Sequence, residues 1–236
     1  MKDIYGQECT ALTADYQPSD FVSDLKERLL SGADHASLSE RATVIAYIAH
    51  EGQKRQSDGQ PYTTHLEYVA AGPDFDEETK AVAWLHDSLE KTRLSANDLL
   101  WLGIPEDVVE DVKYLSTKDS MERHFDDIER LLLRERCRKV KIRDIEHNSS
   151  DRLTFAAQIR EKAEHNNRYY NRLFARNRLW YFSYPLTKAF LETADKYKSW
   201  RKKTIIDFMQ SAHCPEEFRA FERIRYMTSH PLPEAA

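Results

Sequence analysis

An all-α fold is predicted by three features of the 236-residue sequence. The chain has only six glycines and eight prolines, too few for the many turns that β-sandwiches and barrels need. Apolar residues recur at three- and four-residue spacing in segment after segment, which is the period of a helix with one buried face. Hydrophobic residues make up 41% of the chain and charged residues 32%, a mixture that can fill a core at this length.

The elements follow from this spacing and from capping and breaking residues. Ser19 or Asp20 is expected to cap the first helix, and Ser37 or Ser39 the second, because short polar side chains accept the first free N–H groups of a helix. Residues 51–62 are expected to form a loop, since they are polar and contain glycine and proline. The expected helices cover about residues 19–30, 37–50, 64–71, 76–90, 95–102, 105–116, 120–133, 134–148, 152–182, 186–211 and 215–228.

The simplest organisation is one helical domain, residues 19–155, with a helical C-terminal extension, residues 156–230, packed on it. The segment 134–143 is strongly basic, and its expected role is a solvated helix face, with a phosphate-attracting rim as the alternative.

Composition also bounds the partners and the compartment. A net charge of −5 argues against nucleic acid as the partner, and no apolar run approaches the roughly 20 residues of a membrane span. Three dispersed cysteines without a CxxC pair disfavour a disulfide framework. With no secretory leader at the N-terminus, we expect a cytoplasmic protein that meets no membrane.

Four polar features interrupt apolar helices and are the candidates for chemistry. They are His50 after VIAYIA, the pair His86-Asp87 after AVAWL, Glu90, and Asp144 within KVKIRDIEHN. Together they offer imidazoles and carboxylates, a donor set that suits a divalent ion with open positions for water and substrate. Metal-activated water with a neighbouring carboxylate to handle the proton is the chemistry of phosphate-ester hydrolysis.

The order of these residues resembles the H…HD…D signature of HD-domain phosphohydrolases. The segment AHEGQKRQSDGQPYTTH is similar to one in RelA/SpoT-type alarmone hydrolases, as are AWLHDSLEKT and VKIRDIEHNSSD. The resemblance covers about residues 40–155 and implies an all-α HD-domain bundle. It also implies hydrolysis of the 3′-pyrophosphate of ppGpp or pppGpp, a guanosine polyphosphate of the stringent response.

The resemblance implies a role for each matching residue. A manganese-type divalent ion would be held by His50, His86, Asp87 and Asp144. Glu90 would position the attacking water. Arg55 would pack on the guanine. The other residues beside the nucleotide would be Tyr62, His65, Lys118 and Asn148.

One departure from the family pattern bears on activity. The acidic pair of the family is here Glu90-Lys91, and a helix would point Lys91 at Asp87, four residues earlier. In one interpretation, Lys91 pairs with Asp87 or with a substrate phosphate, and hydrolysis is retained. In the other, the site has lost catalysis and the chain is a nucleotide sensor or protein-binding module.

The sequence also leaves the identity of the nucleotide substrate open. Gln56, Leu66 and Ser150 differ from the family pattern. They weaken the case for ppGpp more than the case for a metal-dependent nucleotide hydrolase, so another purine nucleotide, a deoxynucleotide or a dinucleotide remains an alternative. The sequence indicates nothing about the oligomeric state.

Overall fold

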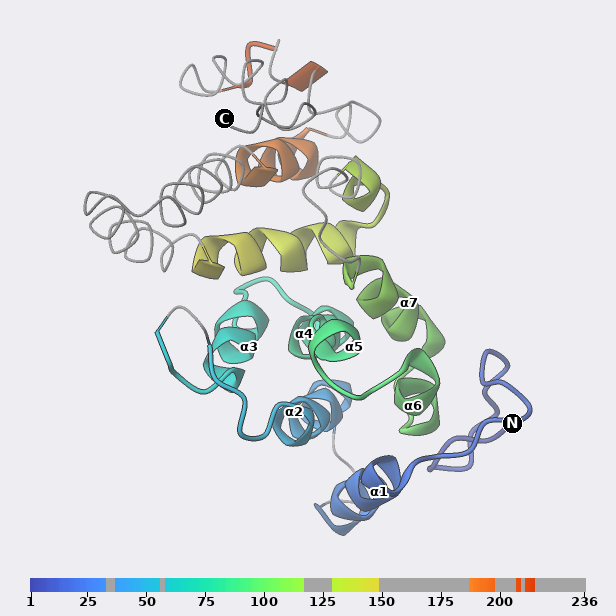
Figure 1. Cartoon of the computed structure of the whole chain (residues 1–236). Coiled ribbons are helices and arrows are strands. Elements are labelled where there is room, and N and C mark those ends of the chain that lie inside the picture. The colour runs from blue at the N-terminus through green and yellow to red at the C-terminus, as the bar shows by residue number, and fades with distance from the viewer. Residues whose placement is uncertain are drawn as a thin grey trace, which may run out of the picture. The chain divides into compact units, whose positions relative to one another are not determined.

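The computed structural model consists of helices and connecting loops, with no strand among the residues that it describes (Figure 1). These residues are 1–32, 37–55, 58–116, 129–148, 187–197, 207–208 and 211–214. The all-α class is confirmed for this part of the chain. The chain divides into two compact units, the first Met1–Lys118 with Lys139–Arg143, the second Asp119–Arg138 with Asp144–Ala236.

Helix α1 (Asp20–Gly32) begins after Ser19, whose hydroxyl accepts the N–H of Val22 at 3.4 Å, as the capping pattern predicts. Its buried residues Val22, Leu25 and Leu29 share one face. Leu30, although apolar, is 43% exposed.

Helix α2 (Leu38–Ala49) begins with a capping box. The Ser37 hydroxyl accepts the N–H of Glu40 at 3.3 Å, and the Glu40 carboxylate accepts the N–H of Ser37 at 2.7 Å. The helix ends at its C-cap, His50. This end matches the expectation and leaves His50 at the start of the loop that follows.

Helices α3 (Thr63–Ala70) and α4 (Glu77–Leu85) follow that loop. Asp76 caps α4 by accepting the N–H of Thr79 at 2.8 Å. Glu77 accepts hydrogen bonds from the N–H and the hydroxyl of Ser39, at 3.1 and 2.8 Å, and so links the first turn of α4 to that of α2.

The sequence pattern predicted one helix from residue 76 past Glu90, and this was wrong. Helix α4 ends at its C-cap, His86, and a separate short helix, α5 (Ser88–Lys91), begins after Asp87, whose φ and ψ are −99° and −4°. The N–H groups of Glu90 and Lys91 both bond to the carbonyl of Asp87, at 3.3 and 2.9 Å. The sequence does not reveal the break, because apolar residues keep their helical spacing on both sides of His86-Asp87.

Helices α6 (Ala96–Trp101) and α7 (Glu106–Leu115) confirm the predicted elements at 95–102 and 105–116. Ser95 and Asp98 form a second capping box at the start of α6. Gly103 has φ +80°, a left-handed conformation that lets the chain turn between the two helices.

The core of the first unit is aliphatic. Helix α4 packs against α2, α3 and α7, so residues on several of its sides are buried. The side chains that lose all contact with solvent include Leu25, Ala42, Ile45, Val69, Ala81, Val82, Leu85, Leu99, Leu102, Val108, Val112 and Val140. A helix buried on this scale fixes the position of the residues at its C-terminal end.

In the second unit, the described helical residues are 129–130, 135–138, 144–148, 187–196 and 207–208, with a 3₁₀ turn at Leu131–Leu133. The guanidinium of Arg138 is completely buried, lies 2.8 Å from the carboxylate of Asp195, and donates to the carbonyl of Leu132 at 3.4 Å. The expectation that the basic segment 134–143 is a solvated face is therefore wrong for Arg138.

Several expectations lie outside the described residues. These are the helices at 152–182 and 215–228, most of the one at 120–133, part of the one at 186–211, and the domain boundary near 155. Within the described part of the chain, no helix is long and apolar enough to cross a membrane.

Candidate metal centre

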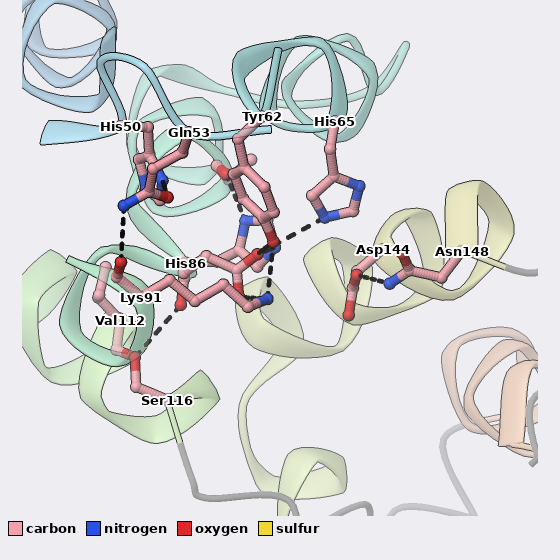
Figure 2. A network of polar contacts seen from close by, with 12 residues as sticks. His50, Gln53, Tyr62, His65, His86, Lys91, Val112, Ser116, Asp144 and Asn148 are labelled. Atoms are coloured by element: carbon pink, nitrogen blue, oxygen red, sulfur yellow. Dashed lines mark hydrogen bonds and ion pairs between the residues drawn. The ribbon is translucent and has the colours of Figure 1, made fainter. Parts of the chain in front are cut away.

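Three buried side chains of the first unit lie close enough to share one metal ion. They are His65 from α3, His86 at the end of α4 and Asp87 at the start of α5, and their ligand atoms all lie within 4.8 Å of one another. Nε2 of His86 is 3.2 Å from Oδ2 of Asp87, and Nε2 of His65 is 3.7 Å from the same oxygen. Figure 2 shows both rings facing the same region from different helices.

The break between α4 and α5 orients His86. Its Nδ1 lies 2.7 Å from the carbonyl oxygen of Ala83, which can only accept, so Nδ1 carries the proton. The backbone carbonyl of His86 accepts the hydroxyl of Ser116 at 3.2 Å (Figure 2). With Nδ1 bonded to Ala83, Nε2 is the ring atom that faces Asp87, which is the orientation of a histidine that binds metal through Nε2.

Asp87 is 7% exposed and is surrounded by positive or polarisable groups. Burial alone would raise the pKa of its carboxyl, but His86, Lys91 and His65 outweigh burial and hold that pKa well below its usual range. Oδ2 accepts the hydroxyl of Tyr62, and Oδ1 lies 2.8 Å from the ammonium of Lys91. The carboxylate is therefore charged and hydrogen-bonded at neutral pH.

His50 is held beside this group by a different set of contacts. Nε2 of Gln53 donates to the carbonyl of Lys91 at 2.8 Å, which turns the amide oxygen of Gln53 toward Nδ1 of His50, 2.9 Å away (Figure 2). Nδ1 of His50 is thus the donor. Burial lowers the pKa of His50 below 6.5, so the ring is neutral at neutral pH. Nε2 is buried and has no hydrogen-bond partner among the described residues.

The expected ligand set stays a prediction, and the geometry groups two of its members with a residue that was expected elsewhere. His65, expected beside the substrate, groups with His86 and Asp87, and His50 is outside that group. The reason is local: His50 ends α2 and stacks on Tyr62 with ring centroids 5.0 Å apart, whereas His65 lies on the buried face of α3.

Asp144 and Asn148 belong to the second unit. The amide of Asn148 donates to the Asp144 carboxylate at 2.5 Å, which confirms that the two share a helix face, as their spacing predicts (Figure 2). Their part in a metal or nucleotide site stays a prediction.

The other expected site residues are placed as follows. Tyr62 bridges Asp87 and Lys91, since its hydroxyl donates to the carboxylate and accepts from the ammonium at 2.7 Å. Arg55 is 7% exposed, with its guanidinium 3.5 Å from Asp58. Glu90 lies on the exposed side of α5. Lys118 lies outside the described residues.

A signal for His65 was present in the sequence. In α3, Leu66, Val69 and Ala70 are buried, and a histidine four residues before Val69 shares their face. A histidine on the buried face of a short helix needs a polar partner, and Asp87 provides one.

The donor set fits a divalent ion. Two imidazoles and one carboxylate form a mixed nitrogen and oxygen site, which suits several divalent metals and does not select one of them. His86 also has the fixed tautomer that such a ligand needs. The ammonium of Lys91 is the one feature that opposes a cation at this position, because it already balances the charge of Asp87.

Comparison of the chain with family models gave no match, and comparison with curated proteins gave none either.

Proposed function

We propose that the chain is a metal-dependent phosphohydrolase of a nucleotide, with a guanosine polyphosphate such as ppGpp as its first candidate substrate. The proposal combines the RelA/SpoT-type motif order with the geometry of the first unit. The metal ligands on that unit would be His65, His86 and Asp87, with His50 as a further candidate.

The observation that carries the proposal is the fixed orientation of His86. Its Nδ1 proton is held by the carbonyl of Ala83, while Nε2 lies 3.2 Å from a charged, buried carboxylate. Without a proton or a cation between them, the Nε2 lone pair and the carboxylate oxygen would repel each other. A proton on Nε2 or a divalent ion would remove that repulsion, and the second imidazole beside the same carboxylate oxygen is the feature that favours an ion.

The residues around the group have distinct tasks in this proposal. A bound divalent ion would supply a Lewis acid and lower the pKa of water near it. Lys91 would contact phosphoryl oxygens, since its ammonium has three donors, and Tyr62 would position Lys91 by accepting one of them. Glu90, on the exposed side of α5, would orient water and accept its proton.

The proposal is tested by incubating the purified chain with Mn²⁺ and ppGpp and measuring the release of pyrophosphate. We expect turnover by the natural sequence and none by the His86→Ala, Asp87→Ala double variant. The matched control is His213→Ala, an exposed histidine of the second unit that stacks on Tyr197. Turnover by the double variant, or its loss in the control, would contradict the site assignment.

A second candidate function is favoured by one contact, the 2.8 Å ion pair between Lys91 and Asp87. In this alternative the site is a non-catalytic nucleotide sensor or partner-binding module. Lys91→Asp restores the acidic pair of the family pattern, and a large gain of hydrolysis on this change would support loss of catalysis in the natural chain.

A panel of nucleotide substrates distinguishes a third possibility, hydrolysis of another nucleotide, from ppGpp hydrolysis and from the non-catalytic alternative. Purine ribonucleotides, deoxynucleotides and dinucleotides are assayed with Mn²⁺ under the same conditions. Turnover of one of them without turnover of ppGpp would keep the hydrolase and change its substrate.

A further inference from the structure

Lys91 contacts the surroundings of the candidate metal group through both its side-chain ammonium and its backbone carbonyl. Its ammonium lies 2.8 Å from Oδ1 of Asp87 and donates to the hydroxyl of Tyr62 at 2.7 Å. Its backbone carbonyl accepts the amide of Gln53 at 2.8 Å. These contacts place the lysine ammonium against the carboxylate of the His65, His86 and Asp87 group.

The three polar side chains form a closed set of contacts. The hydroxyl of Tyr62 donates to Oδ2 of Asp87 and accepts from Lys91, which in turn contacts Oδ1. Each carboxylate oxygen therefore already has a partner, and the charges of Asp87 and Lys91 cancel. An incoming divalent ion gains less from such a carboxylate than from a free one, and it is repelled by the ammonium.

We propose that Lys91 acts as an internal counter-ion that sets the cation affinity of this group, so that a divalent ion and a phosphate anion bind with positive coupling. The proposal rests on the metal site proposed above. A phosphoryl oxygen offers the ammonium a second negative partner. When the ammonium moves to the phosphate, Asp87 is released for the metal, and each ligand strengthens the binding of the other.

The structure allows this exchange with little backbone movement. The side chain of Lys91 is 40% exposed, whereas that of Asp87 is 10% exposed. A lysine has a flexible four-carbon stem, so its ammonium can change partner by rotation about side-chain bonds. The backbone at Lys91 stays in place because Gln53 holds its carbonyl and is itself held by His50.

The first experiment titrates the full chain with Mn²⁺ alone, by calorimetry or by the electron paramagnetic resonance signal of free Mn²⁺. Lys91→Met keeps the length of the side chain and removes its charge, and we expect it to bind Mn²⁺ about 10- to 100-fold more tightly than the natural chain because the repulsion of the ammonium is lost. The matched control is Lys113→Met, which removes an exposed lysine that pairs with Glu110 on α7 and leaves Mn²⁺ affinity unchanged.

The second experiment repeats the titration with inorganic phosphate at a fixed concentration, correcting for free Mn²⁺ through its resonance signal. Phosphate is expected to strengthen Mn²⁺ binding by the natural chain by about fivefold or more, within the usual range of coupling between two sites. The effect of phosphate on Lys91→Met is expected to be smaller.

The outcomes separate this inference from the proposed function. Equal Mn²⁺ affinity for the natural chain and Lys91→Met would overturn the counter-ion role and keep the metal site. Absence of coupling to phosphate in the natural chain would overturn the exchange of partners. No Mn²⁺ binding by either protein would overturn the metal site itself, and the inference with it. If Lys91→Met fails to fold, Lys91→Gln takes its place in the same comparison.

Discussion

The phenol of Tyr16 donates a hydrogen bond of 2.6 Å to Oδ1 of Asp98, which lies 82 residues further along the chain. The other oxygen of Asp98 accepts the N–H and the hydroxyl of Ser95, at 2.6 and 2.7 Å, within the capping box of α6. The ring of Tyr16 also lies 6.2 Å from that of Trp101. One carboxylate thus caps a helix and attaches the N-terminal segment to it.

Removal of this hydroxyl tests the attachment. Tyr16→Phe is expected to lower the free energy of unfolding by about 1 kcal/mol, because a hydrogen bond to a partly buried carboxylate is lost while the ring is kept. Urea unfolding followed by circular dichroism measures the change. Tyr47→Phe is the control, since the hydroxyl of Tyr47 donates to Glu67 at an exposed site and its loss costs less.

The same tyrosine predicts a dependence on alkaline pH. Burial, together with the bond to Asp98, raises the pKa of Tyr16 above its ordinary value of 10.0. The folded chain therefore keeps a proton that the unfolded chain releases, and the stabilisation is present below pH 10 and is lost as the pH rises further. We expect the stability difference between the natural chain and Tyr16→Phe to shrink between pH 9 and 11. A stability difference that stays constant over this pH range would contradict the raised pKa of Tyr16.

The identity of the second imidazole ligand is decided by a pair of variants. His65→Ala is expected to weaken Mn²⁺ binding by about 100-fold or more, because it removes one of three grouped ligand atoms. His50→Ala is expected to weaken it by less than about tenfold, since His50 acts on the group through Gln53. Calorimetric titration of both variants gives the comparison, and the reverse order would return His50 to the ligand set.

The buried guanidinium of Arg138 makes the second unit sensitive to Asp195. Asp195→Asn is expected to lower the free energy of unfolding by about 2–3 kcal/mol, because it leaves a fully buried positive charge without its carboxylate. Glu192→Gln on the same helix removes the exposed partner of Lys188 and is expected to cost under about 0.5 kcal/mol. Similar losses from the two changes, measured by urea unfolding, would contradict the distinction.

The helices of the first unit were predictable because their signals are local. Ser37 with Glu40 is a capping sequence that requires only four adjacent residues, and the structure contains it. The contact between Lys91 and Asp87 was equally predictable, since residues four apart on one helical turn face each other.

The parts that failed depend on tertiary contacts. The break after His86 is stabilised by Ser116, which is 30 residues away in the chain. Burial of Arg138 depends on Asp195, 57 residues away. The proximity of His65 to Asp87 is likewise a tertiary contact between different helices, while the role of His50 as a ligand stays a prediction. These contacts join residues too far apart in the sequence for a local pattern to predict them.

The interruption between α4 and α5 has a consequence for how damage to the site would be detected. Successive side chains of an uninterrupted helix diverge by about 100°, and His86 and Asp87 lie at the interruption, after the last residue of α4 and before the first residue of α5. A deletion or insertion at this joint would change how the two side chains lie relative to each other and leave the helix content almost the same. Far-ultraviolet spectroscopy would score such a variant as intact, and only a ligand-binding assay would expose the defect.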